Sequence, residues 1–380
     1  MCTDNEFEDI RPYSDEETVE AMGRAASHPM LPVISRYLFP NEDPSYLSSC
    51  LLKVKDVDNF QQEVMFGVVS SIIARTSEGF SFSGQEYLTE GGGRFVAVTN
   101  HRDIVLDPAL FLYTMFDAGI TGCELCVGSN LIQTKFIEDM MRSNRMIKVI
   151  RGVSARDLYF SSQKLSKYIR NKVTSGDGSV WIAQREGRTK DGMDRTEQGI
   201  LKMLDMSGSG SFVENFKELN IIPVSISYEY EPCDARKARE LLIKKTEGTY
   251  TKKPGEDTHS ILTGIRQRKG HIHLSIGKPL TEEELRHAAE LDRNNRYQTL
   301  MQILDERITS GYRLWKTNYM GYDLLGGTSD FLGVKYLPED LELFRAYVDH
   351  KLGKIESRLD KGDLTRIFLG IYANPVIRSL

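Results

Sequence analysis

Short β-rich runs alternate with helical segments from Phe80 onward, and this alternation constrains the fold more than any other feature of the chain. Apolar runs predict strands at Phe95–Val98, Glu124–Gly128, Met146–Ile150, Val180–Ala183, Ile221–Ser227 and Ile272–Ile276. Helical spacing is found at Pro108–Ala118, Lys135–Ser143, Ser154–Thr174 and Thr196–Asp205. Because a strand–helix–strand order places helices on the faces of a sheet, we predict an α/β fold with a mixed, largely parallel sheet flanked by helices.

The segments on either side of this alternation indicate further parts of the chain. Residues 1–20 hold eight Asp or Glu and one Arg, so the start of the chain is strongly acidic. Leu51–Thr76 is apolar at helical spacing, and Thr281 with Glu284 forms a capping box before a helical pattern. We predict a disordered acidic tail, an N-terminal helical region, a catalytic domain and a C-terminal helical extension, over residues 1–13, 14–78, 79–280 and 281–380.

Composition narrows the functional class. The longest uncharged stretches, such as Val64–Ala74, fall well short of the roughly 20 apolar residues that a membrane-spanning helix needs. The acidic start also lacks the basic and apolar regions of a secretory signal. Five cysteines fit a reducing compartment. We therefore expect a cytoplasmic protein, either free or peripheral on the cytoplasmic face of the membrane, with no nucleic-acid partner.

Two short motifs carry metal-binding residue types. Cys123 and Cys126 form a C-x-x-C motif, but no second Cys pair or His cluster accompanies it. His271 and His273 lie two apart on a predicted strand and so face the same side, yet no Cys or Glu follows at ligand spacing. Buried thiols and a strand surface are the preferred interpretations. We expect neither a metal nor an organic cofactor.

A polar turn joins the first catalytic-domain strand to its helix. Phe95–Phe111 reads FVAVTNHRDIVLDPALF, which brings a histidine and carboxylates to the end of a predicted strand. A histidine oriented by a carboxylate can act as a general base. His101 is the candidate base, Asp107 its candidate partner, and Asp103 the competing candidate. The alternative is a polar turn whose His only satisfies the backbone.

Three later segments accompany this turn. They read IKVIRGVSARDLYFSSQKLSKYI from Ile147, VWIAQREGRTKDG from Val180 and NIIPVSISYE from Asn220. In order and spacing the four segments resemble the sequence blocks of the glycerolipid acyltransferases over roughly residues 80 to 280. The glycerol-3-phosphate branch is closer than the lysophosphatidate branch, through Asn130-Leu131, the stretch Met140–Ile150 and Tyr228-Glu229.

The chain departs from the family pattern at two places. The family's first block separates His and Asp by four residues, whereas five separate His101 from Asp107 and Leu106 holds the family's position. Pro108 and the apolar run after it favour Asp107 as the equivalent, with one residue inserted. In the third block, Glu186-Gly187-Arg188 lacks the residue between Gly and Arg, and Arg185 replaces the family's Pro.

The resemblance implies an acyltransferase that moves a fatty acyl chain from acyl-CoA or acyl carrier protein to a hydroxyl of glycerol-3-phosphate or a lysophospholipid such as lysophosphatidate. A neutral His can take the hydroxyl proton while its carboxylate partner stabilises the imidazolium. No nucleophile is needed, and the chain has no G-x-S-x-G elbow.

The family's acceptor carries a phosphate, which arginine forks and backbone amides bind well. The resemblance therefore implies a phosphate site whose members are Arg151, Glu186, Gly187, Arg188 and Lys190. Arg102 is a secondary phosphate candidate, and Pro223, in the fourth block, is expected to shape the acyl pocket.

Two alternatives to this function remain open. One is an O-acyltransferase for a non-phosphate lyso-lipid such as an amino lipid, and the other is a non-catalytic lipid- or carrier-binding relative. Residues 234–270 hold ten Lys or Arg and five acids, a local charge of +5. This segment either faces anionic lipid or an acidic carrier protein, or forms an ordinary solvated surface.

Overall fold

A computed structural model of the chain describes residues 6–89, 93–120, 122–176 and 178–380. Seven strands form one sheet in the order β1-β7-β6-β2-β5-β3-β4. Neighbours run parallel except β6 and β7, which are antiparallel. The strands are β1 Ser77–Ser83, β2 Val96–Thr99, β3 Cys123–Gly128, β4 Met146–Val149, β5 Ser179–Ala183, β6 Ile221–Tyr228 and β7 Gly270–Ile276. The predicted mixed, largely parallel sheet is confirmed.

The central strands β2 and β6 are buried along their whole length, because helices cover both faces of the sheet. α6 (Leu106–Asp117) packs on one face, where Phe95, Phe111, Leu125 and Trp181 share one apolar cluster. On the other face lie α8 (Ala155–Ser175), α9 (Gln198–Asp205), α10 (Phe212–Lys217), α13 (Glu282–Ala289) and α14 (Asn295–Gly311). The helix α7 (Lys135–Ser143) leads into the edge strand β4.

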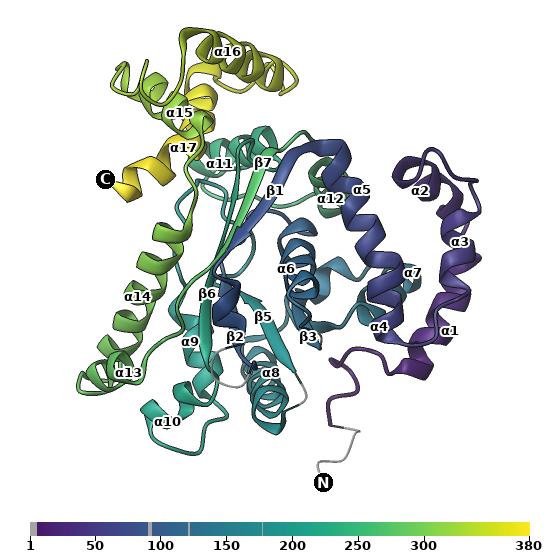
Figure 1. The fold of residues 1–380 in the computed structure, drawn as a ribbon. Coiled ribbons are helices and arrows are strands. Elements are labelled where there is room, and N and C mark those ends of the chain that lie inside the picture. Colours follow the sequence, from purple (N-terminus) through teal and green to yellow (C-terminus); the bar gives the residue numbers. More distant parts are fainter. Residues whose placement is uncertain (1–5, 90–92, 121, 177) are drawn as a thin grey trace.

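Helices outside this core form two groups (Figure 1). The N-terminal group is α1 Asp15–Ala26, α2 Leu31–Leu38, α3 Tyr46–Leu51, α4 Val57–Asn59, the π-helix η1 Phe60–Met65 and α5 Phe66–Thr76. The second group is α11 Asp234–Glu247, α15 Lys316–Gly326, α16 Pro338–Leu352 and α17 Lys361–Ser379, while α12 Glu256–Arg266 lies beside α5. Short 3-10 turns occur at η2 Gln85–Leu88 and η4 Ser129–Leu131. The domain boundaries given above stay predictions.

The start of the chain differs from the disordered tail predicted over residues 1–13. Phe7, Ile10 and Tyr13 are buried, and the Ile10 carbonyl accepts a hydrogen bond from Lys148 N at 2.9 Å. The prediction rested on the acidic charge alone and missed these three apolar side chains. Residues 1–5 lie outside the described part of the chain.

β1 was not predicted from the sequence, because SEGFSFS has a weak alternation of small and aromatic residues. This strand pairs only with β7 and ends at Gly84, whose φ is +79°. A Cβ at Gly84 would lie 2.0 Å from the Ile276 carbonyl oxygen. The turn therefore needs glycine both for its left-handed backbone and for this close approach.

We expect Gly84→Ala to destabilise the protein by about 3 kcal/mol, because backbone strain of roughly 1–2 kcal/mol adds to the clash. Gly119 is the matched control, since its φ is +71° but a Cβ added there would meet nothing within 4 Å. Gly119→Ala should cost only the strain. Urea denaturation of the two variants would show equal losses if the close approach at Gly84 were unimportant.

Candidate active site

The polar turn after β2 is fixed by hydrogen bonds to the neighbouring strands. Asn100 Nδ2 donates to the Ile226 carbonyl at 3.0 Å, and Asn100 Oδ1 accepts from Ile226 N at 2.7 Å. On the β5 side, Gln184 N donates to the Thr99 carbonyl at 2.7 Å. These bonds hold the turn at the carboxyl ends of the adjacent parallel strands β2, β5 and β6. Binding sites of α/β sheets form at this end of the strands.

His101 contacts Asp107 directly in spite of the extra residue between them. His101 Nδ1 lies 2.9 Å from Asp107 Oδ2. The same carboxylate oxygen accepts the backbone N–H of Arg102 at 2.5 Å and of Asp103 at 2.9 Å. Tyr228 Oη donates to the other oxygen at 2.7 Å. Asp107 is buried and bound by four donors, so its orientation is set before any substrate arrives.

This contact sets the tautomer of His101. An ionised carboxylate can only accept hydrogen bonds, so Nδ1 must carry the proton. A neutral His101 then presents an unprotonated Nε2 at the pocket that it lines. Burial and the Asp107 charge raise the pKa of Tyr228 well above its usual range, so its hydroxyl stays a donor to Asp107.

Asp103 has a different contact. Its Oδ1 accepts the backbone N–H groups of Val105 and Leu106, both at 2.9 Å, and thus caps the start of α6. The structure therefore brings Asp107, rather than Asp103, to the His101 ring.

The other predicted blocks reach the same pocket through two loops. Thr189 N donates to the His101 carbonyl at 2.7 Å, which ties the loop after β5 to the histidine turn. The loop after β4 is held by Arg151 N, which donates to Ser129 Oγ at 3.1 Å. His101, Arg151, Gly187, Arg188 and Lys190 all line this pocket.

The two arginines predicted to bind phosphate, Arg188 and Arg151, differ in how far protein partners already engage their guanidinium groups. Arg188 Nη1 is buried and has no hydrogen-bond partner among the described residues. Arg151 Nη1 lies 3.5 Å from Glu186 Oε1, and the Glu186 side chain is largely exposed. Glu186 thus contacts Arg151 but is not a lining residue of the pocket. An unpaired buried guanidinium N–H is costly unless an anion completes it.

Lysines add further positive charge to the pocket. Lys190 is ion-paired with Glu240, and burial lowers the pKa of its ammonium group. Lys252 lines the pocket as well and contacts Asp257 Oδ1 at 2.6 Å. The described lining therefore has four cations, from two arginines and two lysines, and one carboxylate. This balance suits a dianionic ligand.

Arg102 and Pro223, the two secondary candidates, lie elsewhere. The Arg102 guanidinium is buried, donates to Asp194 and Gly192, and pairs with Glu231 at 3.0 Å. Pro223 lies in β6, where its carbonyl accepts Gly277 N at 2.8 Å. Neither is among the residues lining the pocket, so the expected roles in phosphate contact and acyl-pocket shaping are not supported by their positions.

Several residues of this site were not predicted from the sequence. Tyr228 carries a signal, because it lies in the fourth recognised block, but its contact with Asp107 depends on the β2–β6 pairing. Trp181, whose ring centroid is 5.8 Å from that of His101, has the pattern of a core strand residue. Lys252 and Asp257 come from a separate segment that folds back over the pocket.

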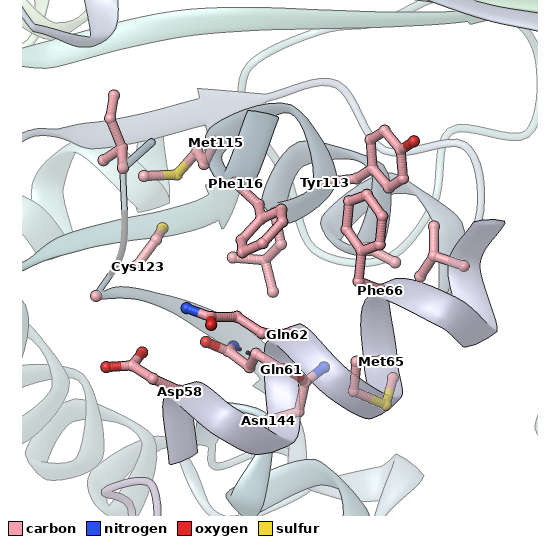
Figure 2. A pocket seen from close by; sticks show the side chains of 15 residues that line it. Asp58, Gln61, Gln62, Met65, Phe66, Tyr113, Met115, Phe116, Cys123 and Asn144 are labelled. Carbon is pink, nitrogen blue, oxygen red and sulfur yellow. Dashed lines mark hydrogen bonds between the residues drawn. The ribbon is translucent and has the colours of Figure 1, made fainter. Parts of the chain in front are cut away.

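A second pocket lies between α6 and the N-terminal helices (Figure 2). Phe66, Tyr113, Met115 and Phe116 make it largely apolar, and Asp58 with Gln61 lies at one side. Its described lining contains no histidine or arginine and has no residue in common with the His101 pocket. The His101–Asp107 pair therefore faces the polar pocket and not this apolar one.

One group of possible metal ligands is found among the described residues: Glu78, Glu229 and His271, whose ligand atoms lie within 4.8 Å of one another. Each is engaged within the protein. Glu78 pairs with Arg268, and Glu229 Oε2 lies 2.7 Å from His271 Nδ1. The group lies on β1 and β7 and directly after β6, and it has no residue in the His101 pocket.

Comparison with known proteins identifies the class. Residues 79–227 match the family model described as Acyltransferase. No curated protein sequence matches the chain. Among solved structures, the 1-acyl-sn-glycerophosphate acyltransferase PlsC from Thermotoga maritima aligns at 12% identity with a TM-score of 0.40, covering 78% of this chain and 95% of that one.

The family-model match contains the first three blocks and most of the fourth, which ends two residues beyond it. The protein is therefore an acyltransferase, as the sequence predicted. Over residues 79–227, the resemblance found in the sequence is confirmed at the level of an acyltransferase domain.

The position of Arg102 predicts a stability effect rather than a binding effect. Arg102→Met leaves Asp194 and Glu231 buried with fewer partners, and breaking such a buried pair costs about 3–5 kcal/mol. Arg151→Met, at a half-exposed position, should cost less than about 1 kcal/mol. Urea unfolding of both variants checks this, and an unchanged stability of Arg102→Met would contradict it.

Proposed function

We propose that the protein transfers a fatty acyl chain from acyl-CoA or acyl carrier protein to a hydroxyl of glycerol-3-phosphate or lysophosphatidate. The observation that carries this proposal is the pairing of a base and an anion site in one pocket. His101 is oriented by Asp107 at 2.9 Å, and Arg188 offers a buried, unpartnered Nη1 in the same lining. The acceptor's hydroxyl and phosphate have matching groups there.

The chemistry follows from the His101 tautomer. Nε2 takes the proton as the acceptor hydroxyl oxygen attacks the thioester carbonyl carbon. The C–S bond then breaks, the new ester forms, and the proton on Nε2 passes to the leaving thiolate. Asp107 stabilises the transient imidazolium by accepting the hydrogen bond from its Nδ1–H group.

Arg151 and Arg188 are proposed to bind the acceptor phosphate. Both line the pocket, and the guanidinium fork matches the geometry of phosphate oxygens. Gly187, with φ of +70°, lets the backbone turn sharply beside Arg188. Lys190 and Lys252 contribute charge while they stay paired with Glu240 and Asp257.

The unpartnered Nη1 of Arg188 favours a phosphate acceptor over an amino-lipid acceptor, because a cationic group would leave this donor unsatisfied. The 2.9 Å contact between His101 and Asp107 favours catalysis over a purely binding role. The extra residue in the first block had left the second alternative open.

The proposal includes peripheral association with the cytoplasmic face of a membrane, since the expected product is a lipid. Within the part of the chain that the structure describes, no helix is long and apolar enough to cross a bilayer. Half of the ten cations in the +5 segment 234–270 have acidic partners, which reduces the charge that this segment offers to a membrane. These pairs are Lys237–Glu231, Arg239–Glu356, Lys245–Asp363, Lys252–Asp257 and Arg268–Glu78.

His101→Ala should lower turnover by at least about 100-fold, because a positioned base contributes on that order. Asp107→Asn should lose a comparable factor through the imidazolium it no longer stabilises. Asp103→Asn is the matched control, since an Asn oxygen still caps α6 and never reaches His101. Purified variants are assayed with radiolabelled acyl donor. An inactive Asp103→Asn beside an active Asp107→Asn would reverse the assignment of the partner.

Arg188→Lys should raise KM for the acceptor by about tenfold while leaving the donor KM nearly unchanged, because the charge stays but the planar fork is lost. Arg185→Lys is the control, since Arg185 is close in sequence but is not a lining residue and lies 3.6 Å from Glu197. An equal rise in the KM of both substrates would point to damage of the fold instead of a phosphate contact.

A further inference from the structure

The first turns of α8 stand clear of the rest of the molecule. Every residue from Gly152 to Phe160 is exposed, whereas the helix is anchored further on by Leu165 and Ile169, which are buried in the core. Ser154 caps the helix by accepting the N–H of Asp157 at 3.2 Å, so the projecting end is a formed helix. We name residues 152–160 the α8 tip.

The α8 tip is apolar to an unusual degree for an exposed helix end. Val153, Leu158, Tyr159 and Phe160 are between 42% and 54% exposed. Its charged side chains are Arg156 and Asp157, which cancel. Large exposed apolar groups that lie together mark an interaction surface, because a monomer has no other reason to leave them in water.

This tip adjoins the proposed active site. Arg151 lines the His101 pocket and is followed directly by Gly152, where the tip begins. Figure 1 places α8 far from the C-terminal helix α16, which lies at the other end of the molecule. A partner that binds the α8 tip would therefore lie close to the His101 pocket.

We propose that the α8 tip is the surface by which the protein docks on a lipid bilayer, inserting its apolar side chains into the interface. This inference rests on the proposed function, whose product is a lipid. Tyr and Phe side chains favour the boundary between headgroups and acyl chains. Helices at a membrane surface bury their apolar side chains about 5–10 Å deep in that boundary.

The arrangement around the helix favours a bilayer over a protein partner. Leu158, Tyr159 and Phe160 are consecutive, and each helical residue is rotated about 100° from the last, so the three side chains spread over more than half of the circumference. A protein groove contacts one side of a helix, whereas a fluid lipid phase surrounds it.

Cations lie at the base of the tip. A groove beside Tyr159 is lined by Lys202, Arg293 and Arg296, with Asp205 as its acid. Arg296 also pairs with Asp205 at 3.5 Å. With the apolar tip inserted among the acyl chains, the cations at its base would lie at the level of the lipid phosphate groups.

The test compares two triple variants by sedimentation with vesicles of phosphatidylcholine alone and of phosphatidylcholine with phosphatidylglycerol. The tip variant is Leu158→Ser, Tyr159→Ser and Phe160→Ser. The control variant is Val334→Ser, Leu337→Ser and Leu343→Ser, whose side chains are 51% to 76% exposed but lie at the other end of the molecule. Circular dichroism melts check that both variants fold.

We expect the tip variant to bind each kind of vesicle at least tenfold more weakly than the parent, with the control unchanged. Binding to phosphatidylcholine should survive high salt, because it is apolar. Equal binding by parent and tip variant, equal loss in the control, or no vesicle binding by the parent would each overturn the proposal. Capture of acyl carrier protein through the tip, without vesicle binding, would replace it with a protein surface.

A second assay separates this inference from the proposed function. With glycerol-3-phosphate and a short-chain acyl-CoA, both soluble, the tip variant should transfer acyl groups as fast as the parent. With acceptor held in vesicles it should be at least tenfold slower. If the parent transfers no acyl group to any acceptor, the proposed function fails, while the sedimentation result still decides whether the tip binds lipid.

Discussion

The site depends on one buried carboxylate. Asp107 accepts from the His101 ring, from two successive backbone N–H groups and from the Tyr228 hydroxyl, so four donors from β6 and the turn after β2 converge on it. A carboxylate taken out of water must be surrounded by donors, and this requirement draws the turn, the first turn of α6 and the end of β6 together. The histidine is oriented as part of the same arrangement.

A second buried network supports the first from behind. Asn100 and Arg102 both donate to Asp194, and Arg102 with Lys237 contacts Glu231. Lys237 Nζ also donates to the Arg102 carbonyl at 2.7 Å. Polar groups on either side of His101 in the sequence thus point into the protein, while His101 itself points to the pocket. This division explains why Arg102, although it follows His101 directly, is not among the residues that line the His101 pocket.

Much of the architecture could be predicted from the sequence, because the strands at Phe95–Val98 and Ile221–Ser227 are mainly apolar runs that a covered sheet can bury. β1 was missed because an edge strand with small polar residues has no such signal. The His101–Asp107 contact was predicted on the apolar helix that follows Asp107, and the inserted residue is taken up within the turn.

Charges were harder to place than apolar residues. The sequence gives the number of cations in residues 234–270 but not their partners. Some of these partners, such as Glu356 and Asp363, lie far along the chain. Lys252 was grouped with a surface patch and instead lines the pocket. The strength of an ion pair depends on the distance between its two charges in the folded protein, and a single sequence does not give that distance.

The segment 6–13 has a consequence for the behaviour of the protein in concentrated solution. β4 is an edge strand of the sheet, and the Ile10 carbonyl accepts the hydrogen bond from Lys148 N–H, which would otherwise be unpaired at this edge. Arg142, from α7, holds this cover by donating to the carbonyls of Glu8 and Arg11. An open strand edge is a template for pairing with another molecule. The few residues before the first helix therefore shield this edge, and a truncation that removed them would expose it to pairing with another molecule.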